Sequence, residues 1–333
     1  MKTGLKYILI NILAVAVMGI IFYGCQKKTS KITIGISKIV AHPALDAVEK
    51  GIQDKLKELG YENIHFDLQN ANGEVSTASS IASKFKSDKV DLAVGIATPT
   101  AIALANTLKD IPVVYSAITD PVDAGLVSSF DKGGKNITGV SDMTPVKEQI
   151  ELLTKIKKIK RLGHIYSSGE ANAVTLADMA AKACKELEIK FIRTTVTNSS
   201  EVKAAAKTII DKVDAIYVST DNTIVSAISS VSDVAWKNNI PIISADPSSS
   251  IKAKILAAWG FDYYKMGLAT GKMISEILDG KKTEDIPTRF MKKTSDVDLL
   301  INLDVAKKLG LSFPKDIQEA ANKIIKDGKL TTK

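Results

Sequence analysis

The sequence predicts an α/β protein of two doubly wound parallel-sheet lobes, joined by a hinge that the chain crosses more than once. From Lys31 onward, short β-branched runs alternate with amphipathic stretches, a pattern typical of parallel sheets. The pattern restarts after Val140, and 333 residues are too many for one ordinary core. Both observations indicate two lobes built on one plan.

The first βα unit shows how the residues specify each element. A strand is predicted at 32–36, where Ile and Thr dominate. Pro43 then opens a helix whose apolar residues recur with a helical period, and Gly60 ends it. The later elements of this lobe are strands at 64–68, 91–97, 113–115 and 136–140, and helices at 74–85 and 99–108.

The second lobe repeats the alternation. Its predicted helices cover 145–158, 171–187, 200–210 and 222–237, and its strands cover 162–166, 191–196, 215–219, 242–244 and 255–259. The helix at 263–278 and the segment after Asp285 are too short for a third core, so we expect them to return to the existing lobes. The expected boundaries are 32–141 plus 262–290 for lobe 1, and 142–261 plus 291–333 for lobe 2.

The first 24 residues have the layout of a lipoprotein signal peptide. They carry Lys2 and Lys6, no acid, and an uncharged run over 8–22 that is shorter than a membrane span. Cys25 follows Gly24 directly, so we expect cleavage before Cys25 and its acylation, with 25–31 as a polar tether. This predicts a lipid-anchored protein on the extracytoplasmic side of a bacterial cell envelope. An uncleaved membrane anchor and a plain secretory signal are the alternatives.

Composition argues against several classes of protein. The net charge is +8, but the lysines are spread along helices and aromatic residues make up only 5%, so we expect no nucleic acid partner. Cys184, the only other cysteine, lies on an apolar helical stripe and is predicted to be a buried thiol. The chain lacks a P-loop, a G-x-S-x-G elbow and spaced metal ligands, so we expect no catalytic residue, metal or cofactor.

A small-molecule site is predicted where the strands end. The carboxyl ends of parallel strands open onto a crevice, into which the following helices direct free N–H groups. The turn at Thr98 suits a carboxylate, and aspartates suit an ammonium group, as an amino acid would require. Tyr115 and Trp259 either cover an apolar part of the ligand or pack in the lobe core or hinge. The candidate contacts are His42, Pro43, Thr98, Tyr115, Thr119, Asp120, Asn172, Asp221, Asn222, Asp246 and Trp259.

Several stretches resemble the ABC transporter substrate-binding family, which includes tryptophan/tyrosine-type binding lipoproteins of the type I periplasmic-binding fold. They are AHPALDAVEKGIQDKLKELGY from Ala41, SDKVDLAVGIATPTA from Ser87, IPVVYSAITDPVDAGLVSS from Ile111, NITGVSDMTPV from Asn136, GEANAV from Gly169, VTNSSEV from Val196 and VDAIYVSTDNTI from Val213. The likeness runs from about Ile32 to Leu311. The positions that match the family's ligand contacts are His42, Thr98, Thr119, Asp120, Asn172, Asp221 and Asn222.

The resemblance implies an extracytoplasmic binding protein that closes on an aromatic amino acid and then binds the permease subunits in the membrane. We expect this protein to be a monomer and to need no cofactor. The chain departs from the family pattern in ADPSSSIKAK from Ala245 and at Ala258-Trp259-Gly260, next to two predicted contacts. Three other functions remain open at this point. They are a sensory receptor, a sugar- or nucleoside-binding protein on the same fold, and an anchored hydrolase.

Overall fold

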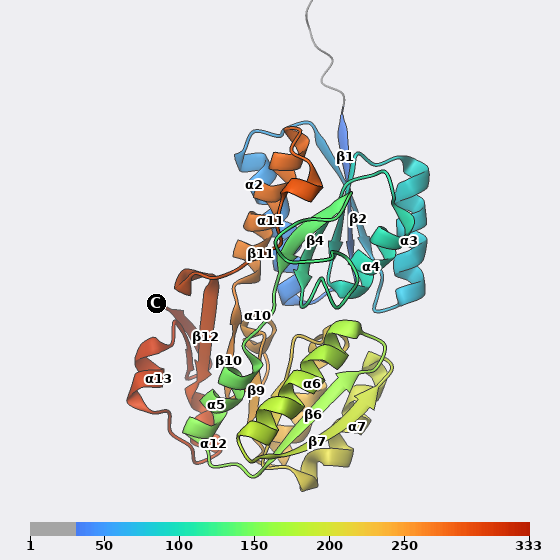
Figure 1. Cartoon of the computed structure of the whole chain (residues 1–333). Helices are drawn as coiled ribbons and strands as arrows, with labels where there is room; N and C mark the ends of the chain where they lie inside the picture. The colour runs from blue at the N-terminus through green and yellow to red at the C-terminus, as the bar shows by residue number, and fades with distance from the viewer. Residues whose placement is uncertain (1–30) are drawn as a thin grey trace, which may run out of the picture.

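Two α/β lobes lie one above the other, each around its own sheet (Figure 1). The computed structural model describes residues 31–333. The predicted signal peptide at 1–24, the acylation at Cys25 and the tether up to residue 30 therefore lie outside the described residues. Within 31–333, every helix falls short of the length and hydropathy that a membrane span requires.

The first sheet has six strands, all of which pair in parallel in the order β11-β5-β4-β3-β1-β2. These are β1 (Ile32–Lys38), β2 (Ile64–Asn70), β3 (Leu92–Ile96), β4 (Val113–Ile118), β5 (Ile137–Ser141) and β11 (Arg289–Phe290). The three central strands β3, β4 and β5 are buried at every position, because helices cover both faces of the sheet.

The second sheet has eight strands in the order β14-β13-β12-β10-β9-β8-β6-β7. These are β6 (Arg161–Ser167), β7 (Lys190–Val196), β8 (Ala215–Val218), β9 (Ile242–Ser244), β10 (Ala257–Phe261), β12 (Val297–Asn302), β13 (Lys323–Lys326) and β14 (Lys329–Thr332). The first five strands of each lobe share one order, so that β2-β1-β3-β4-β5 corresponds to β7-β6-β8-β9-β10. The expectation of two α/β lobes built on one plan is confirmed.

The sequence pattern does not predict the last strands. β12 reaches the second sheet from the opposite direction, after the chain has returned from the first lobe, and therefore pairs antiparallel with β10. β13 and β14 form a hairpin closed by Asp327 and Gly328, both with positive φ. The second sheet is thus mixed at this edge, where the sequence predicts parallel strands only.

Helices flank both sheets. In the first lobe α2 (Pro43–Glu58) packs on α11 (Tyr263–Leu278), and α3 (Val75–Asp88) packs on α4 (Thr98–Thr107). In the second lobe α5 (Val146–Ile156) packs on α6 (Ala171–Glu186), and α7 (Val202–Ile209) packs on α9 (Ile228–Lys237). The shorter helices are α8 (Asn222–Ser226), α10 (Pro247–Ser250), α12 (Leu303–Lys308) and α13 (Lys315–Ala320). The single helix expected at 222–237 is interrupted at Ala227, which separates α8 from α9.

Helix α11 joins the first lobe through a close contact with α2. A Cβ atom on Gly267 would lie 2.3 Å from the carbonyl oxygen of Val48, and one on Gly51 would lie 2.4 Å from that of Tyr264. The two backbones touch because neither glycine carries a side chain. This contact brings residues from the C-terminal third of the chain next to the start of the first lobe.

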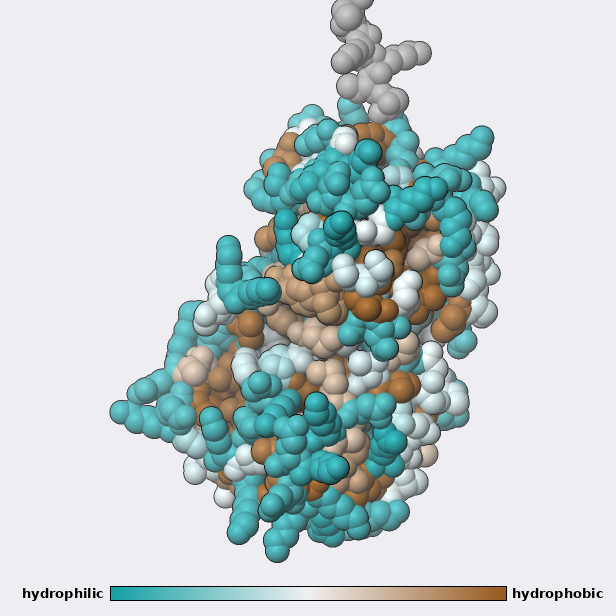
Figure 2. Space-filling model, in the orientation of Figure 1, coloured by the Kyte–Doolittle hydropathy of each residue, from teal (hydrophilic) through white to brown (hydrophobic). Residues whose placement is uncertain are grey.

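The chain passes between the sheets three times, from β5 to α5, from β10 to α11 and from β11 to β12. The surface in Figure 2 is hydrophilic over most of both lobes, and apolar side chains gather across the middle where the lobes meet. The three crossings and the strand ends that face them surround the site described next.

Candidate ligand site between the lobes

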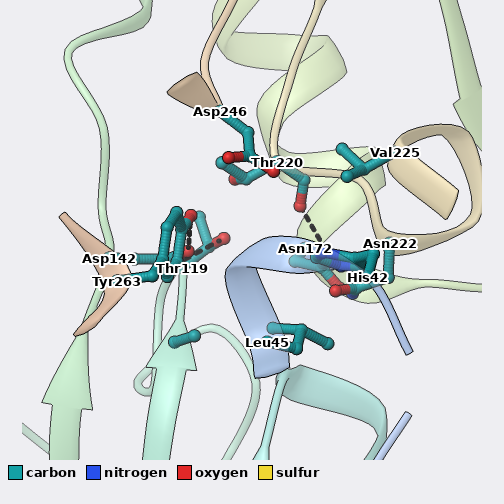
Figure 3. Close-up of a pocket in the computed structure, with 11 residues that line it drawn as sticks. His42, Leu45, Thr119, Asp142, Asn172, Thr220, Asn222, Val225, Asp246 and Tyr263 are labelled. Carbon is teal, nitrogen blue, oxygen red and sulfur yellow. Dashed lines mark hydrogen bonds between the residues drawn. The ribbon is translucent and has the colours of Figure 1, made fainter. Parts of the chain in front are cut away.

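The carboxyl ends of the two sheets face one another across a cavity between the lobes (Figure 3). The space free of atoms at this site is about 310 Å³ when the solvent open to it is included. Such strand ends suit a ligand because loops and helix starts from several strands converge there. The lining residues are His42, Leu45, Ala117, Thr119, Asp142, Asn172, Thr220, Asn222, Val225, Asp246 and Tyr263.

His42 enters the cavity from the first lobe, at the residue before α2. Its side chain is 8% exposed, and neither ring nitrogen has a hydrogen-bond partner of ordinary geometry among residues 31–333. Burial lowers the pKa of His42 below its ordinary value of 6.5, and the facing carboxylate of Asp246 opposes this shift. The ring is therefore neutral near pH 7 and offers one donor and one acceptor.

Three side chains meet at the crossings between the lobes. The Tyr263 hydroxyl donates to Asp142 Oδ2 at 2.9 Å, and Thr119 Oγ1 lies 3.5 Å from Asp142 Oδ1. Burial raises the pKa of Asp142 from 3.8 to about 6, while both hydroxyl contacts lower it. The cluster thus links strand β5, the loop after β4 and the start of α11 at the wall of the cavity.

This raised pKa predicts how stability depends on pH. Between about pH 4 and pH 6 the folded protein holds a proton on Asp142 that the unfolded chain has released, so the wild type loses stability as pH rises. Asp142→Asn removes this loss. We expect the variant to be more stable than the wild type by about 2 kcal/mol near pH 7.5, and equally stable near pH 4.5.

Urea unfolding at both pH values measures the difference between the two proteins. Titrating groups that do not interact with Asp142, such as buried His164, act equally in both proteins and drop out of the comparison. A stability difference that is the same at both pH values contradicts the assignment to Asp142.

Glu170 organises the second-lobe wall. Its carboxylate accepts from Asn222 Nδ2 at 2.5 Å and, more weakly, from Asn172 Nδ2 at 3.5 Å. Its other oxygen accepts from the backbone N–H and the hydroxyl of Thr223, at 3.0 and 2.7 Å. Two asparagines that line the cavity are therefore held by one buried acid.

Asp221 and Asp246 each follow a strand of the second sheet, but they differ in the hydrogen bonds that their carboxylate oxygens accept. Asp221 Oδ2 accepts from the Ser167 N–H and Oδ1 from the Ile224 N–H, and burial raises its pKa well above 3.8. Asp246 Oδ1 accepts from the Ser249 N–H, but Oδ2 is buried and has no partner among residues 31–333. Asp246 lines the cavity and Asp221 does not.

Buried oxygen atoms without partners gather on the second-lobe side. Asn172 Oδ1, Thr220 Oγ1 and Asp246 Oδ2 all lack a hydrogen bond among the described residues, and all three residues line the cavity. Buried polar atoms in folded proteins nearly always have a hydrogen-bond partner, so these three unpartnered atoms indicate that a polar ligand binds here. All three atoms can accept a hydrogen bond, which suits a donor-rich group.

The structure places five of the eleven predicted contacts at the cavity: His42, Thr119, Asn172, Asn222 and Asp246. Tyr115 lies elsewhere, fully buried in the core, with its hydroxyl 2.6 Å from Thr288 Oγ1. Trp259 lies in a groove on the outer side of the second lobe, beside Leu152 and Ile317. Tyr115 therefore fits the packing alternative that the sequence left open, whereas Trp259 lies neither at the cavity nor in the core.

Three further predicted residues lie outside the lining of the cavity. Pro43 is an exposed first-turn residue of α2. Thr98 is buried within the first turn of α4, and its Oγ1 has no hydrogen bond among residues 31–333. Asp120 Oδ1 accepts from the N–H groups two and three residues later, which closes a turn.

Sequence reasoning missed part of the lining. Leu45 and Val225 belong to apolar helical positions that are indistinguishable from core residues by periodicity. Tyr263 and Asp142 lie at crossings between the lobes, and no local pattern brings them together. Glu170 lies behind the lining, and its one usable signal in the sequence is that it stands two residues before Asn172.

Among residues 31–333 no cluster of three or more His, Cys, Asp or Glu could hold a metal ion. Two like lobes that turn polar side chains from both sides onto one interior cavity define a binding protein of the type I periplasmic-binding fold. The chain belongs to the ABC transporter substrate binding protein family, which it matches over residues 33–325. It is a substrate-binding protein of an ABC transporter.

Three relatives describe this family. The chain is 41% identical over 282 residues to a tyrosine-binding protein of Clostridioides difficile, covering 84% of this chain and 81% of that one. It resembles an ABC domain from Streptococcus pneumoniae in complex with L-Trp, with 34% identity, a TM-score of 0.85, and coverage of 89% and 100%. It also resembles the ligand-free, open structure of a substrate binding protein from Clostridium difficile, with 38% identity, a TM-score of 0.64, and coverage of 86% and 97%.

Proposed function

We propose that this protein captures an aromatic amino acid, tryptophan or tyrosine, between its two lobes and delivers it to the permease of an ABC importer without altering it. The observation that carries the proposal is the set of buried, unpartnered oxygens on the second-lobe wall, which suits an α-ammonium group. One relative is a tyrosine-binding protein, and the structure of another is a complex with L-Trp.

Each part of such a ligand has a counterpart in the cavity. Asp246 Oδ2 and Asn172 Oδ1 would accept from the ammonium group. The neutral ring of His42 would donate to the carboxylate from the opposite lobe. Leu45 and Val225 would contact the aromatic ring. The ligand would thereby bridge both lobes.

The arrangement of the lobes supports capture by closure. Sequence identity to the L-Trp complex and to the open structure is similar, yet the TM-score is much higher with the complex. A hydrogen bond of 2.6 Å from Thr175 Oγ1 to Asp123 Oδ2 also joins α6 to the loop after β4. We therefore assign this conformation to the closed state, which the ligand stabilises over an open one.

Isothermal titration calorimetry with the twenty amino acids tests the proposal. We expect heat from tryptophan or tyrosine and none from the acidic or basic amino acids. Silence for every aromatic amino acid would end the proposed ligand class, and conversion of the bound compound would revive the hydrolase alternative.

We further propose that the mature protein is a monomer, anchored by lipid on Cys25 outside the cytoplasm, with lobes at 32–141 plus 262–290 and 142–261 plus 291–333. Cys25→Ser should shift the protein from the membrane to the soluble fraction and abolish palmitate labelling. Cys184→Ser is the matched control, because that thiol is buried in α6 and its pKa is raised to about 12 by burial. Membrane retention of Cys25→Ser would contradict the anchor.

A further inference from the structure

We propose that Glu170 is a positioning residue, which orients the amides of Asn172 and Asn222 so that the second-lobe wall of the cavity selects an ammonium group. The inference rests on the proposed function, since it concerns the ammonium of the amino acid. Glu170 itself does not line the cavity. It is 5% exposed and lies directly behind the two asparagines.

The direction of each hydrogen bond follows from the chemistry of the groups. Asn222 turns its NH₂ toward Glu170 and donates to Oε2 at 2.5 Å. The NH₂ of Asn172 is fixed in the same sense by two acceptors, Glu170 Oε2 at 3.5 Å and the Thr220 carbonyl at 3.3 Å. The backbone N–H of Thr223 holds the carboxylate in place from the other side, at 3.0 Å.

The consequence lies at the opposite end of each amide. An amide whose NH₂ faces Glu170 must direct its oxygen away from it. Asn172 Oδ1 is buried, without a partner among residues 31–333, in a residue that lines the cavity. Asn222 also lines the cavity.

Without the carboxylate, either amide could rotate and turn its NH₂ into the cavity. A donor there would oppose an ammonium group and would tolerate a ligand that lacks one. Asn172 Oδ1 and Asp246 Oδ2 can only accept on this side of the cavity, so a ligand with no donor leaves both atoms unpaired. Glu170 therefore controls selectivity without touching the ligand.

Glu170→Gln tests this, since glutamine keeps the size of the side chain but can also donate. Calorimetry compares each aromatic amino acid with its desamino analogue, 3-(indol-3-yl)propanoate for tryptophan and 3-(4-hydroxyphenyl)propanoate for tyrosine. We expect the wild type to prefer the amino acid by about 100-fold or more and the variant by less than about 10-fold, with little change for the analogue. Equal losses for both ligands, which leave the ratio unchanged, overturn the inference.

Two further variants sharpen the result. Glu186→Gln makes the same chemical change at an exposed residue of α6 paired with Lys147, and should leave the ratio unchanged. Asn172→Ala removes the oriented oxygen without altering Glu170, and should lower the ratio about 10-fold even if Glu170→Gln does not fold. An unchanged ratio in Asn172→Ala overturns the inference.

The wild type separates this inference from the proposed function. If it binds none of the twenty amino acids, the proposed function is wrong and the inference falls with it. If it binds one of them and Glu170→Gln keeps the full preference for the amino acid, only the inference is wrong.

Discussion

Replacing Asp246 with asparagine should weaken binding of the aromatic amino acid by about 100-fold. Asp246 is 1% exposed, and its Oδ2 is the one carboxylate oxygen of the cavity lining that lacks a partner among residues 31–333. Asparagine removes the charge that would pair with the ammonium group and places a donor or a neutral oxygen there instead. It still caps α10 through the oxygen that accepts from Ser249, so the fold should survive.

Asp120→Asn is the matched control for calorimetry. Asp120 also accepts from backbone N–H groups on a strand-end loop, but it lies outside the cavity lining, so the variant should bind within about 3-fold of the wild type. An affinity of Asp246→Asn within the same narrow range would remove Asp246 from the ammonium site. A loss in Asp120→Asn as large as in Asp246→Asn would favour the wider contact set predicted from sequence.

Gly267→Ala should destabilise the first lobe by about 3 kcal/mol or more, which is a large share of the stability of a typical domain. The added methyl group would lie 2.3 Å from the Val48 carbonyl oxygen, so α2 and α11 must move apart. In an isolated helix the same change would be stabilising by about 1 kcal/mol. The sign of the effect therefore reports the contact between the two helices.

Lys272→Ala is the control on the exposed side of α11 and should change the free energy of unfolding by less than about 0.5 kcal/mol. Urea unfolding of the three proteins measures both effects. A Gly267→Ala protein that is more stable than the wild type would show that the helices can separate without loss.

The order of the elements was predictable because residues that start and end helices mark the boundaries within each βα unit. Pro43 and Gly60 bound a helix on sequence evidence alone, and the structure has α2 at Pro43–Glu58. The C-terminal strands were not predictable in this way. No helix of a βα unit leads into β12, and its pairing with β10 depends on where the returning chain enters the second lobe.

The residues of the site were easier to predict from the topology of the sheets than from local sequence patterns. The strand-end rule leads to Asn172 and Asp246, which reach the cavity from two different strands of the second sheet. The same rule selects Asp221, but both of its carboxylate oxygens already accept hydrogen bonds from backbone N–H groups. Which oxygen of a capping aspartate remains free depends on three-dimensional geometry, so sequence could not separate Asp221 from Asp246. Whether the lining residues bind the ligand stays a prediction.

The direction of β1 determines how the cavity of an anchored molecule would be oriented relative to the membrane. The seven residues Ile32–Lys38 run toward the cavity, so the amino end of this strand lies at the far pole of the first lobe, about 20 Å away. A tether attached there would hold the first lobe near the membrane and leave the second lobe as the part that swings. Each opening would then turn the mouth of the cleft relative to the bilayer while the anchored pole stays still.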